Sequence, residues 1–492
     1  MKRDETPAPE PSPEDVARCL DVLRAVALLP DDHPVRLTVE RAATQVQRGM
    51  KKRLRRERGR VTRETDRATV QALQSARREE NGVRDLATPQ DSEPPAHVLR
   101  SRRCYVCKER FTRLHPVYLS LCPACAELSE SRRAQHVSLE GRRALVTGGR
   151  IKVGFHVALR LLRDGAHVHV TSRFPRDAAL RFSREPDFAR WRERLVLHEL
   201  DLRFPQRVLA FAEHLCATEP HLDILVNNAA QTVRLTPEQG TALLTGEREL
   251  ARVLDTSTLS LVRESPGFAI EDALPAVGLP GLVASGATLA PSGSPELTAG
   301  DAWPLGGVSG LAATGAPPLT GLIPQAVPHD TGDVNAWVQR LEEIPPVEVL
   351  EAQLVNAIAP FLLNGRLKPL LARSPFPDRY IVNVSAVEGQ FERQGKTVFH
   401  PHTNMAKAAL NMMTRTSAED YARDGIYMNS VDPGWISNEN PEPRRRRMEE
   451  EGFSPPLDGA DAAARVCDPI VQGVQGRPVY GRFLKDFRDT PW

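Results

Sequence analysis

The strongest constraint on the fold is a series of short apolar runs that begins at Arg142 and alternates with segments of helical character. The runs end in Gly, Asn, Ser or Pro, and their sequences are RALVTGG, AHVHVTSR, RLVLHELDL, LDILVNNAA, RYIVNVSA and GIYMNSVDPG. Near-continuous apolar strands that alternate with helices are typical of a parallel sheet with both faces covered. We therefore predict an α/β fold with a doubly wound, Rossmann-like parallel sheet, whose ligands bind beyond the carboxyl ends of the strands.

The residues before this domain predict a helical N-terminal extension and a small separate module. Residues 1–14 are rich in proline and acidic residues, which predicts disorder. Residues 15 to about 80 have helical character, and Val16, Leu20, Leu23 and Ala27 recur at spacings of three and four, as in a helix. Residues 87–97 have the composition of a linker. We predict a partly disordered helical extension over 1–97 and a second module over 98–138.

The remaining domain, residues 139–492, is interrupted by a segment of different composition. The strand–helix pattern breaks over residues 231–345, and residues 278–324 within them consist largely of Gly, Ala, Pro and Ser with scattered leucines. A structureless loop longer than about 15 residues is unusual inside a compact domain, and such segments are usually lids or disordered inserts. We predict a mostly mobile insert over 231–345.

The overall charge indicates no particular partner, because 65 Lys and Arg face 63 Asp and Glu. Residues 48–60 hold eight basic residues and one acidic residue, which is typical of a solvated helix face and is also compatible with a nucleic-acid patch. The chain has no run of about 18 apolar residues, so we expect no membrane span. Its first residues lack the apolar core of a secretion signal, and we expect a cytoplasmic protein.

Two CxxC pairs predict a metal site. Cys104 and Cys107 form the first pair and Cys122 and Cys125 the second, with fourteen residues between the pairs. In a reducing compartment this pattern favours a metal over disulfides, and four thiolates suit a closed, structural zinc site. Incidental reduced cysteines are the alternative. The basic residues 48–60 and this module together predict a binding surface over residues 48–125, for either a protein or a nucleic acid.

The segment TGGRIKVG follows the first strand of the domain and precedes an amphipathic helix. Backbone amides at the start of such a helix face the phosphates of a ligand. Gly148 suits a tight turn, and Gly154 lets the helix approach the strand closely. A turn without any ligand fits these glycines equally well.

Five motifs in order resemble those of the short-chain dehydrogenase/reductase family. TGGRIKVG is similar to the Thr-Gly-x-x-x-Gly-x-Gly loop of the family, and NNAA to its Asn-Asn-Ala-Gly segment. NVSA carries the serine after the fifth strand, TNMAKAAL is similar to the Tyr-x-x-x-Lys helix, and NSVDPGWIS is similar to the Asn-x-x-x-Pro-Gly segment. The resemblance covers about residues 140–487, apart from the insert.

The resemblance implies a bound dinucleotide. The residues that would contact it are Thr147, Gly148, Gly154, Asp201, Leu202, Asn228, Ala229, Lys407, Pro433, Gly434, Ile436 and Ser437. Family members that use NAD carry a carboxylate after the second strand, where this chain has Arg173. A guanidinium favours the 2′-phosphate of NADP over NAD, and Arg150 could add to that pocket; an exposed turn residue is the alternative for Arg173. Lys152 replaces a family glycine and would either reach a phosphate or crowd the site.

The resemblance also implies catalytic residues. Ser385 would orient the substrate oxygen, Lys407 would hold the nicotinamide ribose, and Asn356 would extend a proton relay. Pro360 has no N–H, so it leaves the carbonyl of Asn356 without its helical partner and free to hold a water. Thr403 stands where the family has its tyrosine.

The replacement at 403 raises the question of the proton donor. An aliphatic hydroxyl is a far weaker acid than a phenol, so we expect Thr403 to pass a proton along. His402 and His400 are local substitutes with an ordinary pKa near 6.5, although both could be packing residues. His402 would serve only if the helix begins after it.

Two functions remain open. The first is an NADP-dependent oxidoreductase with an altered proton donor, which acts on a small-molecule carbonyl or alcohol. The second is a catalytically silent NADP-binding scaffold or redox sensor that acts through its zinc module and basic helices. A homo-oligomer is compatible with either.

Overall fold

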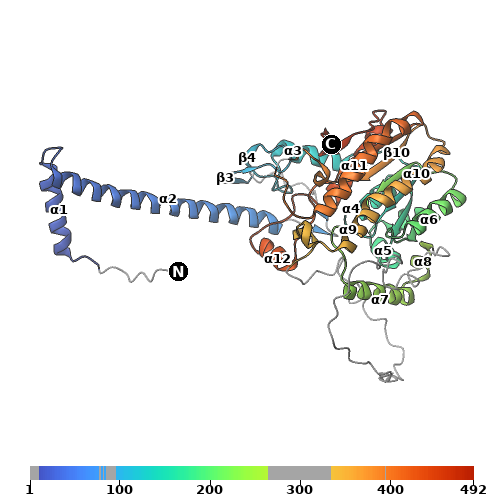
Figure 1. The fold of residues 1–492 in the computed structure, drawn as a ribbon, viewed down its shortest axis with the longest axis horizontal. Helices are drawn as coiled ribbons and strands as arrows, with labels where there is room; N and C mark the ends of the chain where they lie inside the picture. Colours follow the sequence, from blue (N-terminus) through green and yellow to red (C-terminus); the bar gives the residue numbers. More distant parts are fainter. Residues whose placement is uncertain (1–9, 77–78, 81–82, 85–95, 264–333, 394) are drawn as a thin grey trace, which may run out of the picture. The chain divides into compact units, whose positions relative to one another are not determined.

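The computed structural model describes residues 10–76, 79–80, 83–84, 96–263, 334–393 and 395–492. The chain splits into two compact units (Figure 1). Unit 1 comprises Met1–Arg77, Pro89–Cys104 and Lys108–Cys122, and unit 2 comprises Arg78–Thr88, Tyr105–Cys107 and Pro123–Trp492.

The described residues of unit 1 form two helices and a two-stranded antiparallel sheet. These are α1 (Pro13–Ala27), α2 (Pro34–Ala76), β3 (His97–Arg103) and β4 (Arg110–Arg113). The carboxylate of Asp66 on α2 accepts the backbone N–H groups of Leu99 and Arg100 at 2.6 and 3.0 Å, which ties the helix to β3. The helices agree with the apolar spacing of the sequence. The predicted disorder and linker fall largely on residues outside the described ranges.

Unit 2 is built on a nine-stranded sheet with the order β13-β12-β11-β10-β8-β5-β6-β7-β9. Its strands are β5 (Arg143–Thr147), β6 (His167–Ser172), β7 (Leu195–Glu199), β8 (Ile224–Asn227), β9 (Val262–Arg263), β10 (Arg379–Val384), β11 (Ile426–Asp432), β12 (Phe483–Lys485) and β13 (Arg488–Thr490). Neighbours are parallel except β12 and β13. The strand order reverses between β5 and β8, as in a doubly wound sheet, so the predicted fold class is confirmed. Unit 2 also holds the short pair β1 (Glu79–Glu80) and β2 (Val83–Arg84).

Helices cover both faces of this sheet. The α-helices in the described part of unit 2 are α3 (Pro123–Ala134), α4 (Lys152–Arg163), α5 (Pro175–Ser183), α6 (Pro205–Thr218), α7 (Pro237–Val253), α8 (Thr256–Leu259), α9 (Pro346–Gln353), α10 (Ala359–Ala372), α11 (Pro401–Arg423), α12 (Glu442–Glu450) and α13 (Gly459–Val474). Val146 of β5 packs in a cluster with α4, α5 and α13, and its neighbour Leu145 packs in a cluster with α6, α10 and α11. Alternate side chains of a strand point to opposite faces, so each face has its own core.

The helical stretch Pro346–Ala372 is apolar enough to cross a membrane by length and composition alone, with a mean hydropathy of 1.3. It consists of α9, a π-helical turn at Leu354–Ile358, and α10. Leu363, Leu367 and Leu371 are fully buried in the core beneath the sheet. Core helices of α/β domains share this composition, and we assign the stretch to the core.

Ordered structure extends into the segment 231–345 that its composition assigns to a mobile insert. Helix α7 begins with a capping box formed by Thr236 and Gln239, and Pro237 occupies its first position. Strand β9 then pairs in parallel with β7 at the edge of the sheet. Residues 264–333 of the predicted insert lie outside the described residues.

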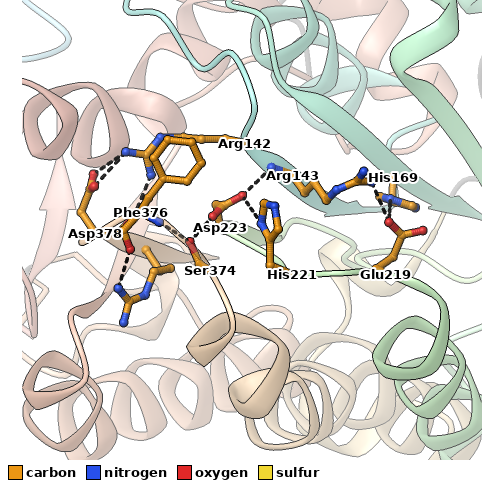
Figure 2. Close-up of polar contacts among 10 residues, drawn as sticks. Arg142, Arg143, His169, Glu219, His221, Asp223, Ser374, Phe376 and Asp378 are labelled. Atoms are coloured by element: carbon orange, nitrogen blue, oxygen red, sulfur yellow. Dashed lines mark hydrogen bonds and ion pairs between the residues drawn. The ribbon is translucent and has the colours of Figure 1, made fainter.

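The amino ends of the central strands are held by paired charges (Figure 2). The guanidinium of Arg142 donates to both carboxylate oxygens of Asp378 at 2.8 and 2.9 Å and lies over the ring of Phe376. The carboxylate of Asp223 accepts the backbone N–H of Arg143 at 2.6 Å. These side chains are committed to one another, which leaves the carboxyl ends of the strands as the place for a ligand.

Candidate active site

The glycine loop and the NNAA segment interlock where the strand order reverses. The hydroxyl oxygen of Thr147 accepts the backbone N–H groups of Asn228 and Ala229 at 3.0 and 3.1 Å, and the Asn228 amide donates to the carbonyls of Thr147 and Gly148. A Cβ on Gly154 would lie 2.3 Å from the Asn228 amide nitrogen and 2.4 Å from the Gly148 carbonyl oxygen. Only a glycine fits there. Asn228 therefore supports the loop, and α4 begins directly behind it.

Lys152 pairs with a carboxylate on the segment after β11. Its φ is +52°, a value common for glycine, and its Nζ pairs with Oε1 of Glu439 at 2.7 Å. The Ser437 hydroxyl donates to the same oxygen at 2.6 Å. Burial opposes ionisation of Glu439, but these two partners outweigh it and lower the pKa of the carboxyl. Lys152 thus connects the glycine loop to the segment after β11.

The two arginines near the second strand differ in their partners. Arg150 is buried and pairs with Asp177 at 2.5 Å, whereas half-buried Arg173, after β6, makes no hydrogen bond or ion pair with another described residue. Burial lowers the pKa of the Arg173 guanidinium, against the attraction of Asp201. Asp201 itself is held by Arg203, with a closest contact of 2.6 Å. The positive charge of Arg173 is therefore not neutralised by an ion pair.

Asp201 and Leu202 follow β7 and are buried, and Pro433, Gly434, Ile436 and Ser437 follow β11. Sequence reasoning missed Asp432 at the end of β11. Its carboxylate accepts the backbone N–H groups of Gly434 and Val387 at 2.7 and 3.0 Å and pairs with Lys485 at 2.9 Å. Asp432 fixes the start of the segment after β11, and its place directly before the Pro-Gly pair was the available signal.

Lys407 lies at the carboxyl end of β10. Its Nζ donates to the carbonyl of Val384 at 2.7 Å. Burial lowers the pKa of Lys407 to about 8, although Glu388 and Asp432 oppose the shift. The next residue after the strand is Ser385, whose hydroxyl donates to the Asn411 side chain at 2.6 Å. Lys407 and Ser385 thus meet at one strand end.

Asn356 lies in the π-helical turn between α9 and α10. Its side-chain oxygen accepts the backbone N–H of Gln231 at 2.7 Å, and its amide donates to the Gln231 carbonyl at 3.0 Å. Pro360 follows four residues later and cannot donate to the Asn356 carbonyl. π-Helical turns are frequent at functional sites. The turn joins Asn356 to the residue that follows the NNAA segment.

The first turn of α11 places the two histidines differently. The helix begins at Pro401, so His402 lies inside it, is buried, and has an Nδ1 without a partner among the described residues. His402 was expected to serve as the proton donor only if the helix began after it, and the helix begins before it. His400 directly precedes the helix, and its Nδ1 lies 3.1 Å from the Asn404 side-chain oxygen and 3.4 Å from the Thr403 hydroxyl. Thr403 donates to the His400 carbonyl at 2.9 Å.

The four paired cysteines lie close together. The sulfur atoms of Cys104, Cys107, Cys122 and Cys125 are all within 4.8 Å of one another, and none forms a disulfide. Zn–S bonds of about 2.3 Å in a tetrahedron fit this spacing. The Cys122 backbone N–H donates to the Cys104 sulfur at 3.3 Å, which favours a thiolate.

Relatives match the chain to different extents. An uncharacterized protein of Acanthamoeba polyphaga mimivirus is 29% identical over 384 residues, which are 75% of this chain and 71% of that protein. The short chain dehydrogenase/reductase dpchH of Colletotrichum higginsianum is 37% identical over 100 residues, 20% of this chain and 24% of its own length. A short chain dehydrogenase from Burkholderia cenocepacia, solved in complex with NADP, aligns at 18% identity with a TM-score of 0.42, over 70% of this chain and 96% of that one.

Two family models match the domain that carries the site. The model described as short chain dehydrogenase matches residues 142–268, and the model described as enoyl-(acyl carrier protein) reductase matches residues 327–451. The first range contains strands β5 to β9, and the second contains β10 and β11. The chain is therefore similar to short-chain dehydrogenases over these two ranges.

Proposed function

We propose that the protein is an NADP-dependent oxidoreductase that interconverts an alcohol and a carbonyl. The observation that carries the proposal is the position of the Lys407 ammonium at the carboxyl end of β10, beside Ser385. The glycine loop and the NNAA segment lie at the ends of β5 and β8. When bound there, NADP would supply the hydride acceptor.

The charge of Arg173 supports NADP over NAD. A guanidinium without an ion pair suits a phosphate, which it can bind through two charge-assisted hydrogen bonds. Arg150 also lies over the Phe174 ring, but its guanidinium is already paired with Asp177. We therefore assign the 2′-phosphate contact to Arg173 alone.

Ser385 would orient the substrate oxygen. Its hydroxyl hydrogen points to Oδ1 of Asn411, and the buried Nδ2 of Asn411 has no partner among the described residues. A half turn of this amide would let Nδ2 donate to the serine oxygen, because amide orientations are assigned from the hydrogen-bond network. The serine hydrogen would then be available to a substrate carbonyl.

The test is turnover. NADPH oxidation is followed by absorbance with a panel of aldehydes, ketones and quinones, and NADP reduction with the corresponding alcohols. We expect Lys407→Ala to lower kcat at least about 100-fold, the usual minimum for loss of an acid–base or positioning group. Arg415→Ala, an exposed change on the same helix, should leave kcat unchanged. NADPH binding without any turnover would support the silent scaffold instead, and no binding would contradict both.

The cysteine cluster supports a second, structural proposal: that it binds one zinc ion. All four ligand positions are filled by sulfur, so no position is open for a reacting water. A protein or nucleic-acid partner on residues 48–125, a homo-oligomer and a cytoplasmic location stay predictions.

A further inference from the structure

We propose that His400 is the acid–base residue of this site, and that its Nε2 exchanges the substrate hydroxyl proton in place of the missing phenol. The proposal rests on the oxidoreductase function proposed above. His400 is seven residues before Lys407, and Thr403 and Asn404 lie between them at helical spacing. The Nδ1 atom of His400 lies 3.4 Å from the hydroxyl of Thr403, which stands four residues before Lys407 on α11. The imidazole therefore lies beside the position of the missing phenol.

The backbone at His400 is strained and held in place. Its φ and ψ are 44° and 47°, in the left-handed region that a non-glycine residue rarely adopts. The His400 N–H donates to the carbonyl of Gln339 at 2.9 Å, and the imidazole stacks on the Trp337 indole with 4.0 Å between ring centroids and 6° between planes. Such strain persists where the surroundings fix it, and it concentrates at functional sites.

The tautomer of His400 follows from the orientation that the structure gives the Asn404 amide. The side-chain oxygen of Asn404 only accepts, so Nδ1 carries the hydrogen at 3.1 Å from it. Nε2 then holds the lone pair. Thr403, whose hydroxyl hydrogen is used by the His400 carbonyl, can accept a second, longer bond from Nδ1. Thr403 and Asn404 are therefore positioning residues that aim Nε2 away from the helix.

Nε2 is the ring nitrogen of His400 for which the described residues provide no partner, on a side chain that is only 8% exposed. Within the described part of the chain it makes no hydrogen bond, and it is not among the buried polar atoms that lack a partner. Burial lowers the pKa of His400, while Glu388 and the Asn404 contact oppose the shift. The imidazole is thus neutral near pH 7 and ready to act as a base.

The step balances for alcohol oxidation. The substrate alcohol loses its hydroxyl proton to Nε2 and the hydrogen on its carbinol carbon, with the bonding electron pair, to the nicotinamide of NADP. A carbonyl, a reduced nicotinamide and an imidazolium result, and the imidazolium releases its proton to water. Carbonyl reduction runs the same path backwards from the imidazolium.

The test is His400→Gly with added imidazole. Glycine accepts a positive φ without strain, so this variant should fold, and it leaves a space against Trp337 that imidazole can enter. We expect kcat to fall about 100-fold or more, NADPH affinity to stay within threefold, and imidazole to restore turnover with a pH profile that follows its own titration. His33→Gly is the matched control, because His33 also directly precedes the proline that begins a helix, and it should keep full activity.

A second variant covers folding defects. His400→Gln keeps a polar side chain that does not titrate, and it should lose the acid limb of kcat against pH while it still binds NADPH. The proposal would be overturned if either variant kept the wild-type kcat or the acid limb of its pH profile. It would also be overturned if His400→Gly bound NADPH normally but imidazole did not restore its turnover. A wild-type protein that binds NADPH but turns nothing over would overturn it too. Failure to bind NADPH would instead overturn the proposed function.

Discussion

At the scale of single residues, the site differs from its family pattern at Thr403 and Lys152, and the structure gives each a local role. Lys152 is paired with Glu439, and Thr403 is bonded to the residue before its helix. The sequence showed both replacements but not these partners, because the partners come from backbone geometry. The positive φ of His400 has no sequence signature. Its imidazole and the Asn404 amide become neighbours only when α11 begins at Pro401.

Arg173 should set the choice between NADP and NAD. Hydrogen bonds to charged groups contribute about 1.5–3 kcal/mol, so Arg173→Gln should weaken NADPH binding about 10- to 100-fold and leave NADH binding unchanged. Fluorescence titration of both nucleotides measures this. Arg190→Gln, a change in a short helical turn of unit 2, is the control. Equal losses for both nucleotides would argue against a 2′-phosphate contact.

Gly154 should tolerate no side chain. Its added Cβ would lie against the Gly148 carbonyl and the Asn228 amide, and overpacking of this kind costs about 1–3 kcal/mol. Gly154→Ala should therefore lower the free energy of unfolding by that amount and weaken NADPH binding. Gly240→Ala on α7 meets nothing within 4 Å and should be neutral or slightly stabilising. Denaturant titration compares the two, and equal effects would contradict the close approach.

At the scale of elements, the six apolar runs of the sequence became β5, β6, β7, β8, β10 and β11, because each is buried on both faces. The edge strands β9 and β13, and β12 beside β13, are two or three residues long, too short for an apolar pattern. Helix α7 was missed because its low apolar content resembled the following segment. The capping box at Thr236 was the signal that could have found it.

Two buried histidines on the neighbouring strands β6 and β7, His169 and His198, should make the stability of the domain sensitive to acid. Burial and the nearby His169 lower the pKa of His198 to about 3, while an unfolded histidine titrates near 6.5. Between these values the unfolded state binds a proton that the folded state does not, so stability falls as pH falls, by up to about 1.4 kcal/mol per pH unit. His169 lies 3.0 Å from His198 and faces Glu219 (Figure 2).

His198→Leu should therefore flatten the decline of unfolding free energy between pH 6 and about pH 4, as urea titrations at several pH values would show. His33→Gln in unit 1 should keep the slope of the wild type. An unchanged slope in His198→Leu would mean that other groups control the acid sensitivity.

At the scale of the whole molecule, the order of strands and motifs was enough to predict the doubly wound domain and its similarity to short-chain dehydrogenases. The sequence did not predict the division into two units, because the segment with the four paired cysteines contributes residues to both units. The spacing of the cysteines predicted the cluster, because each CxxC pair holds its two sulfurs close together and the two pairs meet in the structure. Residues 264–333 lie outside the described residues.

The purified protein should contain one zinc ion per chain. Cys107→Ser removes one of the four sulfurs and should lower the zinc content at least tenfold, as elemental mass spectrometry would show. Cys19→Ser changes an exposed cysteine outside the cluster and should leave the metal in place. Equal zinc content in the two variants, or none in the wild type, would argue against the metal site.

Hydrogen–deuterium exchange on addition of NADP is the most direct test of where the nucleotide lies. We expect slower exchange at residues 147–154, 227–230 and 433–437 and at the start of α11, all at the carboxyl ends of the strands, with less protection in Lys407→Ala. Protection confined to other surfaces, or none at saturating NADP, would contradict the proposed site.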